Sequence, residues 1–178
     1  FSDIEEFYRE LNVQVYLQSL SKFNLSRVHQ LVYKTNQFNS TSVRYTKKEL
    51  ENLGDKVIVL AAKDKFSERE NIGLIVIDES IQEGSIICNL KTFILSCRAL
   101  GKGIEKGVFV WVIGHALDRK AEKIVADFSR TDRNLPVENF YFSNKFEHTG
   151  DSFILDNLSR ISVDQNVIAI FDERIGRT

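Results

Sequence analysis

The residues best placed for chemistry lie in the turn Arg98-Ala99-Leu100-Gly101-Lys102-Gly103, which follows a long strand-like run and precedes a helical one. Glycines let a backbone come close to a ligand, and a helix start offers unpaired N–H groups with a partial positive charge. The turn therefore predicts a cradle for a pyrophosphate group. A plain strand-to-helix turn is the alternative. Dinucleotide and P-loop motifs fit less well, because Lys106 stands where a third glycine is needed and no Gly-Lys-Ser/Thr occurs.

Two further groups beside this turn are candidates for chemistry. Cys97 precedes Arg98 and a helix start, and both favour a thiolate, which makes Cys97 a candidate nucleophile. A small buried cysteine at a strand end is the alternative. A separate polar run also suggests an acceptor pocket, because no helical or strand pattern requires it. It comprises Asn36, Gln37, Phe38 and Asn39. A turn held by its own asparagine side chains would explain it equally well.

Composition narrows the function classes. Twenty-four basic and twenty-five acidic residues give a net charge of -1, which offers no general field for nucleic acid or an anionic membrane. The apolar runs at 72–77 and 108–113 are far shorter than the roughly 20 residues of a spanning helix. The two cysteines lack metal-ligand spacing. We therefore expect a cytoplasmic protein with no metal, no disulfide, no nucleic-acid partner and no membrane partner.

The periodicity predicts a mixed α/β fold, with a mostly antiparallel sheet and helices on both faces. A lead-in helix from a preceding domain is expected within residues 1–12, and a single domain over residues 13–178. The expected strands are 13–17, 57–63, 72–78, 85–96, 123–128, 152–158 and 163–171. The expected helices are 25–34, 47–53, 104–120 and 135–146.

In this context, the turn at 98–103 resembles the Arg/Gln-x-x-Gly-x-Gly/Ala signature of the GNAT superfamily, which has the acyl-CoA N-acyltransferase fold. The resemblance implies that backbone amides of the turn bind the pyrophosphate of acetyl-CoA, another acyl-CoA or a related phosphopantetheine carrier. It also implies that pantetheine lies along Ile94, Leu95 and Ser96.

A second segment, 134–141, is similar to the Asn plus Phe-Tyr segment of the same superfamily. The resemblance implies that Asn134 contacts the cofactor and that Tyr141 donates a proton to the leaving thiolate. Such a transfer is chemically reasonable, because a phenol can protonate a thiolate. Alternatively, Phe140 and Tyr141 are core aromatics on a buried helix face.

Three segments together look like the C-terminal domain of FkbH-like proteins: 34–39 with 44–46, 96–101, and 134–141. This resemblance implies 1,3-bisphosphoglycerate as donor, the phosphopantetheine of an acyl carrier protein as acceptor, and a role in methoxymalonyl-type polyketide extender biosynthesis. It also implies a HAD-type domain of the same polypeptide as partner. The Asp-x-Asp-x-Thr/Val nucleophile motif of that domain is absent here, so no phosphatase activity is expected.

Three functions remain open from the sequence. The first is an acyltransferase domain that loads a glyceryl or other C3 acyl unit onto a carrier protein. The second is a non-catalytic domain that docks the phosphopantetheine arm, which the lack of Asp or Glu in 85–96 mildly favours. The third is an ordinary GNAT N-acetyltransferase, which requires an acidic acceptor pocket that the sequence does not locate.

Overall fold

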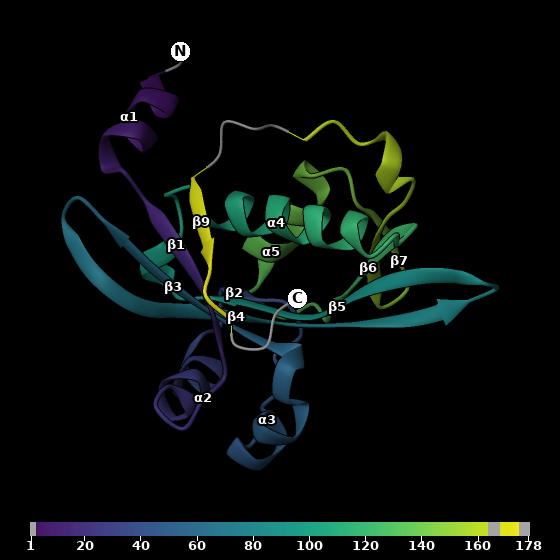
Figure 1. Cartoon of the computed structure of the whole chain (residues 1–178), viewed down its shortest axis with the longest axis horizontal. Helices are drawn as coiled ribbons and strands as arrows, with labels where there is room; N and C mark the ends of the chain where they lie inside the picture. The colour runs from purple at the N-terminus through teal and green to yellow at the C-terminus, as the bar shows by residue number, and fades with distance from the viewer. Residues whose placement is uncertain (1–2, 164–167, 175–178) are drawn as a thin grey trace.

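The computed structural model describes residues 3–163 and 168–174 of the chain and shows one mixed sheet with helices on both faces (Figure 1). The strand order is β7-β8-β6-β5-β4-β3-β1-β9, and β2 pairs with β5 beside this path. The strands are β1 (Gln14–Ser19), β2 (Phe38–Asn39), β3 (Val57–Asp64), β4 (Ser67–Gln82), β5 (Ser85–Leu95), β6 (Lys123–Asp127), β7 (Glu147–Thr149), β8 (Ser152–Leu155) and β9 (Ala169–Asp172).

The helices cover the sheet in two groups. On one face lie α4 (Ile104–Asp118) and α5 (Leu135–Ser143), and on the other lie α2 (Leu25–Lys34) and α3 (Lys47–Leu53) (Figure 1). The short helix α1 (Asp3–Leu11) precedes β1. Each face has its own apolar core, because alternate residues of a strand point to opposite sides. Val15 and Leu17 belong to the core under α4, whereas Val57 and Val59 belong to the core under α2.

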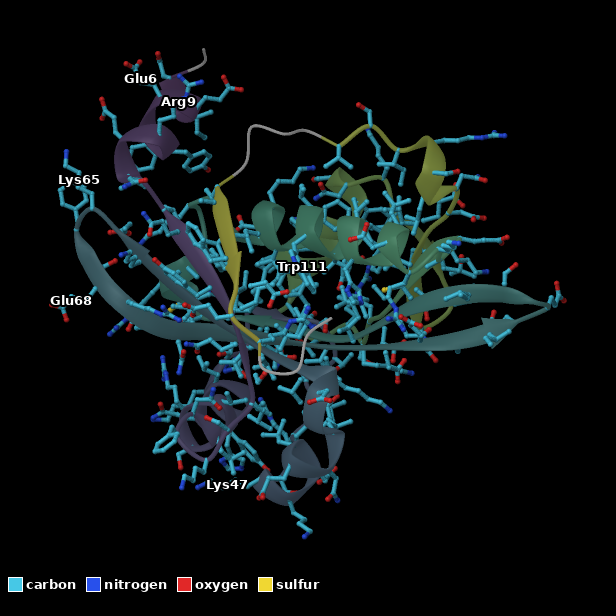
Figure 2. The ribbon with its side chains drawn as sticks, viewed as in Figure 1. Glu6, Arg9, Lys47, Lys65, Glu68 and Trp111 are labelled. Carbon is cyan, nitrogen blue, oxygen red and sulfur yellow. The ribbon has the colours of Figure 1, made fainter. Side chains whose placement is uncertain are left out.

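The burial of the side chains confirms the elements that the sequence patterns predicted. Val15 and Leu17 are fully buried on β1, and α4 buries Val108, Val112 and Ala116. Figure 2 shows how the side chains of α4, including Trp111, fill the space above the sheet. The predicted start of α3 is also confirmed, since Thr46 and Glu49 form a reciprocal capping box.

Five strands differ markedly from the prediction. β4 is a long strand rather than a short one at 72–78, and β8 ends at Leu155 rather than 158. The short strands β2 and β7 were not predicted, because runs of two and three residues are too short to show periodicity. Of the predicted strand 163–171, residues 164–167 lie outside the described residues, and β9 occupies the end of the range.

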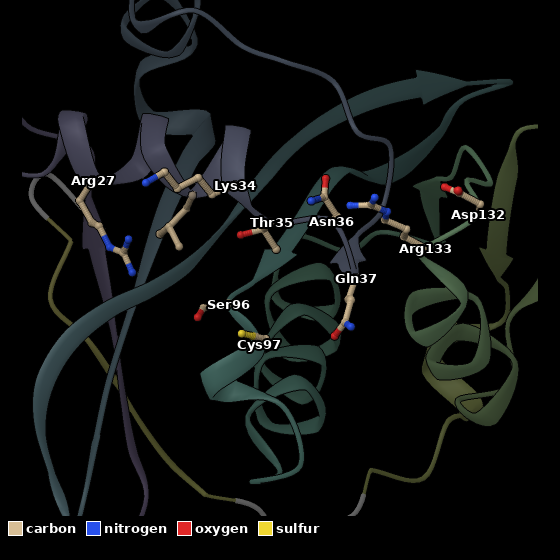
Figure 3. Close-up of a pocket in the computed structure, with 10 residues that line it drawn as sticks. Arg27, Lys34, Thr35, Asn36, Gln37, Ser96, Cys97, Asp132 and Arg133 are labelled. Atoms are coloured by element: carbon tan, nitrogen blue, oxygen red, sulfur yellow. The ribbon is translucent and has the colours of Figure 1, made fainter.

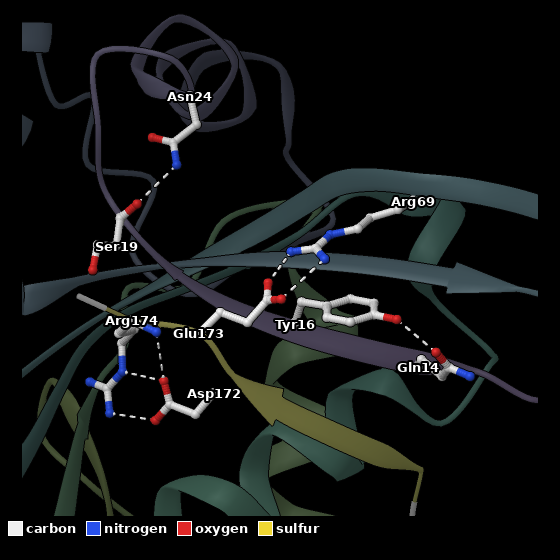
Figure 4. A network of polar contacts seen from close by, with 8 residues as sticks. All are labelled: Gln14, Tyr16, Ser19, Asn24, Arg69, Asp172, Glu173 and Arg174. Atoms are coloured by element: carbon white, nitrogen blue, oxygen red, sulfur yellow. Dashed lines mark hydrogen bonds and ion pairs between the residues drawn. The ribbon is translucent and has the colours of Figure 1, made fainter. Parts of the chain in front are cut away.

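The edge strand β9 runs parallel to β1 and is held there by polar contacts (Figure 4). Arg69 of β4 forms an ion pair with Glu173, and its guanidinium lies 3.8 Å from the ring centroid of Tyr16. Arg174 binds Asp172 through two bonds of 2.8 and 2.9 Å. Tyr16 and Phe171 stack at 5.4 Å. The contacts of Arg69 and Tyr16 hold β9 and Glu173 against the sheet.

Candidate functional site

A pocket of about 720 Å³ opens at the end of β5, where the chain enters the short 3-10 helix Cys97–Ala99 (Figure 3). Three separate parts of the chain line this pocket. They are α2 and the loop after it, the end of β5, and the loop before α5. The lining residues are Arg27, Leu31, Lys34, Thr35, Asn36, Gln37, Ser96, Cys97, Asp132 and Arg133. The sequence predicted Asn36, Gln37, Ser96 and Cys97 as site residues, and the structure brings these four together.

The pocket carries a net positive charge. Arg27, Lys34 and Arg133 contribute three cations against the one carboxylate of Asp132. The amide of Asn36 is oriented by Arg44, whose guanidinium donates to Asn36 Oδ1 at 3.0 Å. Cations and amides together suit an anionic or polyhydroxylated ligand. The lining does not provide the predominantly acidic pocket expected for an amine acceptor.

Cys97 is the accessible thiol of this pocket. It is exposed, because β5 ends at Leu95 and the chain turns away from the sheet. The turn is stabilised by Ser96 Oγ, which accepts a hydrogen bond of 3.3 Å from the Arg98 N–H. The buried strand-end alternative is therefore wrong for Cys97. Cys88, in contrast, is buried within β5, where burial, with Glu79 and Asp78 nearby, raises the thiol pKa to about 12.

The glycine turn has the backbone geometry that the sequence predicts. Gly101 and Gly103 have φ angles of 77° and 81°, which favour glycine, and Gly103 is the N-cap of α4. Lys102 anchors the turn to β3 through a 2.9 Å bond to Asp64. Ala99 is buried, and Arg98 pairs with Glu70 at 3.5 Å. Leu100 packs partly buried against the main core. Pyrophosphate binding by these residues stays a prediction.

The proposed pantetheine path along β5 is covered by the chain itself. β6 pairs with β5 only as far as Leu90, and β2 occupies the next part of that edge, with Phe38 opposite Leu95 and Asn39 opposite Ile94. Ser40 continues the contact, since it donates to the Phe93 carbonyl at 3.1 Å and its Oγ accepts from the Phe93 N–H at 2.8 Å. Pantetheine therefore fits along this edge only if β2 moves.

Four predicted ligand contacts are consequently corrected: Ile94, Leu95, Phe38 and Asn39 are all buried and lie outside the lining of the pocket. Phe38 packs edge-on against Phe93 with ring centroids 5.0 Å apart. Asn39 is a satisfied turn residue, which was the alternative interpretation, because its amide donates to Thr35 O and accepts from the Ser42 N–H.

Asn134 and Tyr141 also differ from their predicted roles. The Asn134 amide donates to Asn39 O at 3.0 Å and to Ser129 O at 2.8 Å, and its oxygen accepts from the Thr131 N–H. Both of its donors are therefore used within the protein. Tyr141 is fully buried, and its hydroxyl finds no partner among the described residues. Burial, reinforced by Asp127, raises the Tyr141 pKa. A buried phenol of this kind cannot protonate a thiolate in the pocket.

Sequence reasoning missed four residues that matter to the site. Arg27 and Lys34 lie within the predicted helix 25–34, and Arg133 directly precedes Asn134, the residue for which the family resemblance implied a ligand contact. These three cations come together only in the folded chain, where α2 and the loop before α5 line the same pocket as Cys97. The fourth residue, Glu105, lies in the first turn of α4, and one of its carboxylate oxygens is buried. For the three cations, contact between distant segments was the missing signal.

The ion pair beneath the turn gives a testable stability effect. Burial alone disfavours the charged form of Asp64, but hydrogen bonds from Lys102 and the Phe66 N–H outweigh it and lower the Asp64 pKa to about 2. Because the folded pKa is below the unfolded value of 3.8, this stabilisation is present at neutral pH and is lost as pH falls toward 2. Asp64→Asn is expected to reduce the free energy of unfolding at pH 7 by about 1–2 kcal/mol.

Urea unfolding at pH 7 and pH 3 measures this effect. The gap between wild type and Asp64→Asn is expected to shrink at pH 3. Asp151→Asn, on an exposed turn, is the control and should stay within about 0.5 kcal/mol of wild type. An equal gap at both pH values would show that the Asp64 charge contributes nothing.

Residues 3–163 and 168–174 contain no helix long and apolar enough to cross a membrane. The same residues contain no group of three or more His, Cys, Asp or Glu side chains arranged to hold a metal ion.

Comparison with known proteins identifies the fold. No protein-family model and no curated protein matches the sequence. The structure of the NatC complex bound to Gag peptide and CoA contains a similar chain, with a TM-score of 0.60 and 13% identity, covering 80% of this chain and 98% of that one. Arabidopsis thaliana NAA60 in complex with a bisubstrate analogue gives 0.62 and 14%, covering 79% and 96%. A putative acetyltransferase of the GNAT family from Desulfovibrio desulfuricans gives 0.60 and 14%, covering 80% and 98%. The chain therefore has the GNAT acyltransferase fold.

Proposed function

We propose that the chain is an acyltransferase domain in which the Cys97 thiol accepts an acyl group and passes it to the phosphopantetheine thiol of an acyl carrier protein. The observation that carries the proposal is the position of Cys97, an exposed thiol in a large cationic pocket of an acyltransferase fold. The fold likeness supports acyl transfer as the class of reaction, since the similar NatC structure is described as bound to CoA.

The chemistry requires two balanced steps. The Cys97 thiolate attacks the acyl carbon of an acyl phosphate or acyl thioester, a C–S bond forms, and the phosphate or thiolate leaves with the electron pair. The deprotonated carrier thiol then attacks the new thioester, and the Cys97 thiolate leaves. Arg27, Lys34 and Arg133 would hold the anionic parts of donor and carrier arm, while the amides of Asn36 and Gln37 would bind acyl hydroxyls.

The resemblance to FkbH-like proteins leads us to propose the substrate of this chain as well. The acyl unit would be glyceryl from 1,3-bisphosphoglycerate, and the product would serve methoxymalonyl-type extender biosynthesis. A HAD-type domain of the same polypeptide is the proposed partner, and the cytoplasm is the proposed location. The cationic lining of the pocket supports this choice of donor, because a phosphorylated acyl compound is an anion.

Intact-protein mass spectrometry tests the first step. The chain is incubated with 1,3-bisphosphoglycerate, or with an acyl-N-acetylcysteamine thioester that carries no phosphate. Wild type is expected to gain the mass of one acyl group, which hydroxylamine releases as expected for a thioester. A chain that keeps its mass with both donors would sink the proposal.

Direct N-acetyl transfer is the competing function, and the fold likeness to NatC and NAA60 favours it. It needs acetyl-CoA and an amine, and no protein thiol. An assay with acetyl-CoA and a peptide library separates the two functions, because amine acetylation that survives Cys97→Ala belongs to the N-acetyltransferase mechanism. A carrier-docking domain without chemistry would bind holo carrier protein and acquire no acyl group.

A further inference from the structure

One side of the molecule is built from a stretch of chain that contains no acidic residue. Residues 20–48 include α2 and the first two residues of α3, and they hold none of the 25 acidic residues and six of the 24 basic ones. The six are Lys22, Arg27, Lys34, Arg44, Lys47 and Lys48. This leaves 18 basic against 25 acidic residues in the rest of the chain, a net charge of -7. A chain that is almost neutral as a whole therefore has one strongly basic segment.

The fold gathers these cations around α2. Arg27 and Lys34 lie on the helix itself. Arg44 is bound to its last turn, because the guanidinium donates to a backbone carbonyl there. Lys47 is bound to its first turn through a 3.1 Å hydrogen bond to Ser26. Because α3 packs beside α2 on the same face of the sheet, the segment forms one surface, which we call the basic face (Figure 1).

The cations of the basic face are not neutralised by the protein. None of the six forms an ion pair with a carboxylate among residues 3–163 and 168–174, although other lysines and arginines in the same ranges do. Five of the six side chains are exposed, and Arg27 is half-buried. Glu49 directly follows the segment, and its carboxylate is used to cap α3 through the Thr46 N–H. The basic face therefore presents positive charge to a partner.

Exposed aromatic side chains lie among these cations. Phe23 is 89% exposed, and Tyr33 is 43% exposed. Lys22 Nζ lies 5.1 Å from the centroid of the Phe23 ring, and the Arg44 guanidinium lies 5.8 Å from that of Tyr33. Aromatic residues and arginine are enriched in protein interfaces, and complementary charge steers two proteins together. This composition suits a protein partner with an acidic surface.

The charge of the rest of the chain favours a compact partner over a long polyanion. A standard protein interface takes about 800 Å² from each partner, so a compact acidic protein can contact the basic face alone. A nucleic acid or an anionic membrane would extend past this face and meet the acidic remainder of the chain, which repels it.

We infer that the basic face is the docking surface for the acidic surface of a carrier protein, whose arm would enter the neighbouring pocket and reach Cys97. Two residues of the basic face, Arg27 and Lys34, also line that pocket, so a partner docked here lies at its mouth. The inference rests on the proposed function for the identity of the partner, and its test is separate from the chemistry at Cys97.

Fluorescence anisotropy with an acidic acyl carrier protein in its apo form tests the docking surface alone, because an apo carrier has no phosphopantetheine arm to accept an acyl group. Wild type is expected to bind it saturably and to lose at least 5-fold in affinity between about 50 and 300 mM salt, since salt screens exposed charges. The double variant Lys47→Glu, Lys48→Glu is expected to bind at least 10-fold more weakly. These residues begin α3, where a carboxylate favours the helix, so the variant should fold.

Lys65→Glu with Lys145→Glu is the matched control, because both lysines are exposed and lie outside the basic face; Figure 2 shows Lys65 far from Lys47. This control should bind as wild type does. Lys22→Glu is a second variant of the basic face, and a loss of at least 3-fold is expected. Should the Lys47 and Lys48 double variant fail to fold, Lys22→Glu decides.

The inference would be overturned by wild type that shows no saturable binding, by binding that salt leaves unchanged, or by a control that binds as weakly as the variants. Tighter binding of an RNA oligonucleotide or of phosphatidylserine vesicles would overturn it as well. Acylation of Cys97 by the phosphate-free thioester is read separately by mass. A chain that binds the apo carrier and acquires no acyl group keeps its docking surface and loses the proposed function.

Discussion

Replacement of Cys97 by alanine is expected to lower the rate of acyl transfer to a holo carrier protein by at least about 1,000-fold. The reason is that the proposed thioester forms on this sulfur, and no other exposed thiol lies among the described residues. The measurement is acyl-carrier formation followed by mass spectrometry under steady-state conditions. Cys97→Ser keeps the size of the side chain and should also be severely impaired, since an alcohol is a much weaker nucleophile than a thiolate at neutral pH.

Cys88→Ala provides the control for this prediction. Cys88 is buried on β5, and its thiol stays protonated at neutral pH because burial raises its pKa to about 12. Its loss should leave the transfer rate within about 3-fold of wild type, with a stability cost of about 1–2 kcal/mol for the lost methyl-sized packing. A Cys97→Ala variant that transfers as fast as Cys88→Ala would remove Cys97 from the mechanism.

The second large effect is expected at Gly73, which lies on β4 opposite Leu95 at the end of β5. A Cβ at this position would lie 2.2 Å from the Ile94 carbonyl oxygen and 2.8 Å from Leu95 Cδ2. The carbonyl is backbone of a central strand, so it cannot move without shifting the strand. Gly73→Ala is expected to destabilise the fold by about 3 kcal/mol and to displace Ser96 and Cys97.

Chemical denaturation checks this value, and Gly114→Ala is the matched control. Gly114 is exposed on α4, and a Cβ there meets no atom within 4 Å. The same change of one methyl group should raise stability by about 0.5–1 kcal/mol, because alanine favours a helix more than glycine does. If both variants unfold at the wild-type midpoint, the close approach of β4 and β5 is not as described.

The sequence was sufficient for the main elements of the fold. Alternation at Val13, Val15 and Leu17, the Thr46–Glu49 capping box and the helical spacing of Val108, Val112 and Ala116 each predict their element from local contacts alone. The antiparallel run of β3, β4 and β5 follows from the short polar loops between three apolar runs. These features are local, so a single sequence contains them.

The site was predictable only in part, because it depends on contacts between distant segments. Cys97, Ser96, Asn36 and Gln37 were recognised by residue type and by their place beside a turn. The pairing of Asn39 with β5 was not predicted, because its partner Ile94 lies more than fifty positions away in the sequence. Likewise the family motif suggested a ligand for Asn134 and a free hydroxyl for Tyr141, while tertiary packing places both in the interior.

The difference between motif and structure has a physical origin at the glycine turn. The left-handed conformations of Gly101 and Gly103 shape a cradle for any anion, and the motif does not specify which anion fills it. In this chain the start of α4 also carries an acidic residue, Glu105, one of whose carboxylate oxygens is buried without a partner among the described residues. The motif alone therefore does not specify what the turn binds, and pyrophosphate binding there stays a prediction.

A single-turnover chase tests the central claim most directly. The acylated wild-type chain is isolated, its modified peptide is located, and holo carrier protein is then added. The account predicts that the acyl group lies on Cys97 and passes to the carrier thiol at least as fast as steady-state turnover. An adduct that stays on the chain, or a carrier acylated while Cys97 remains unmodified throughout, would contradict it.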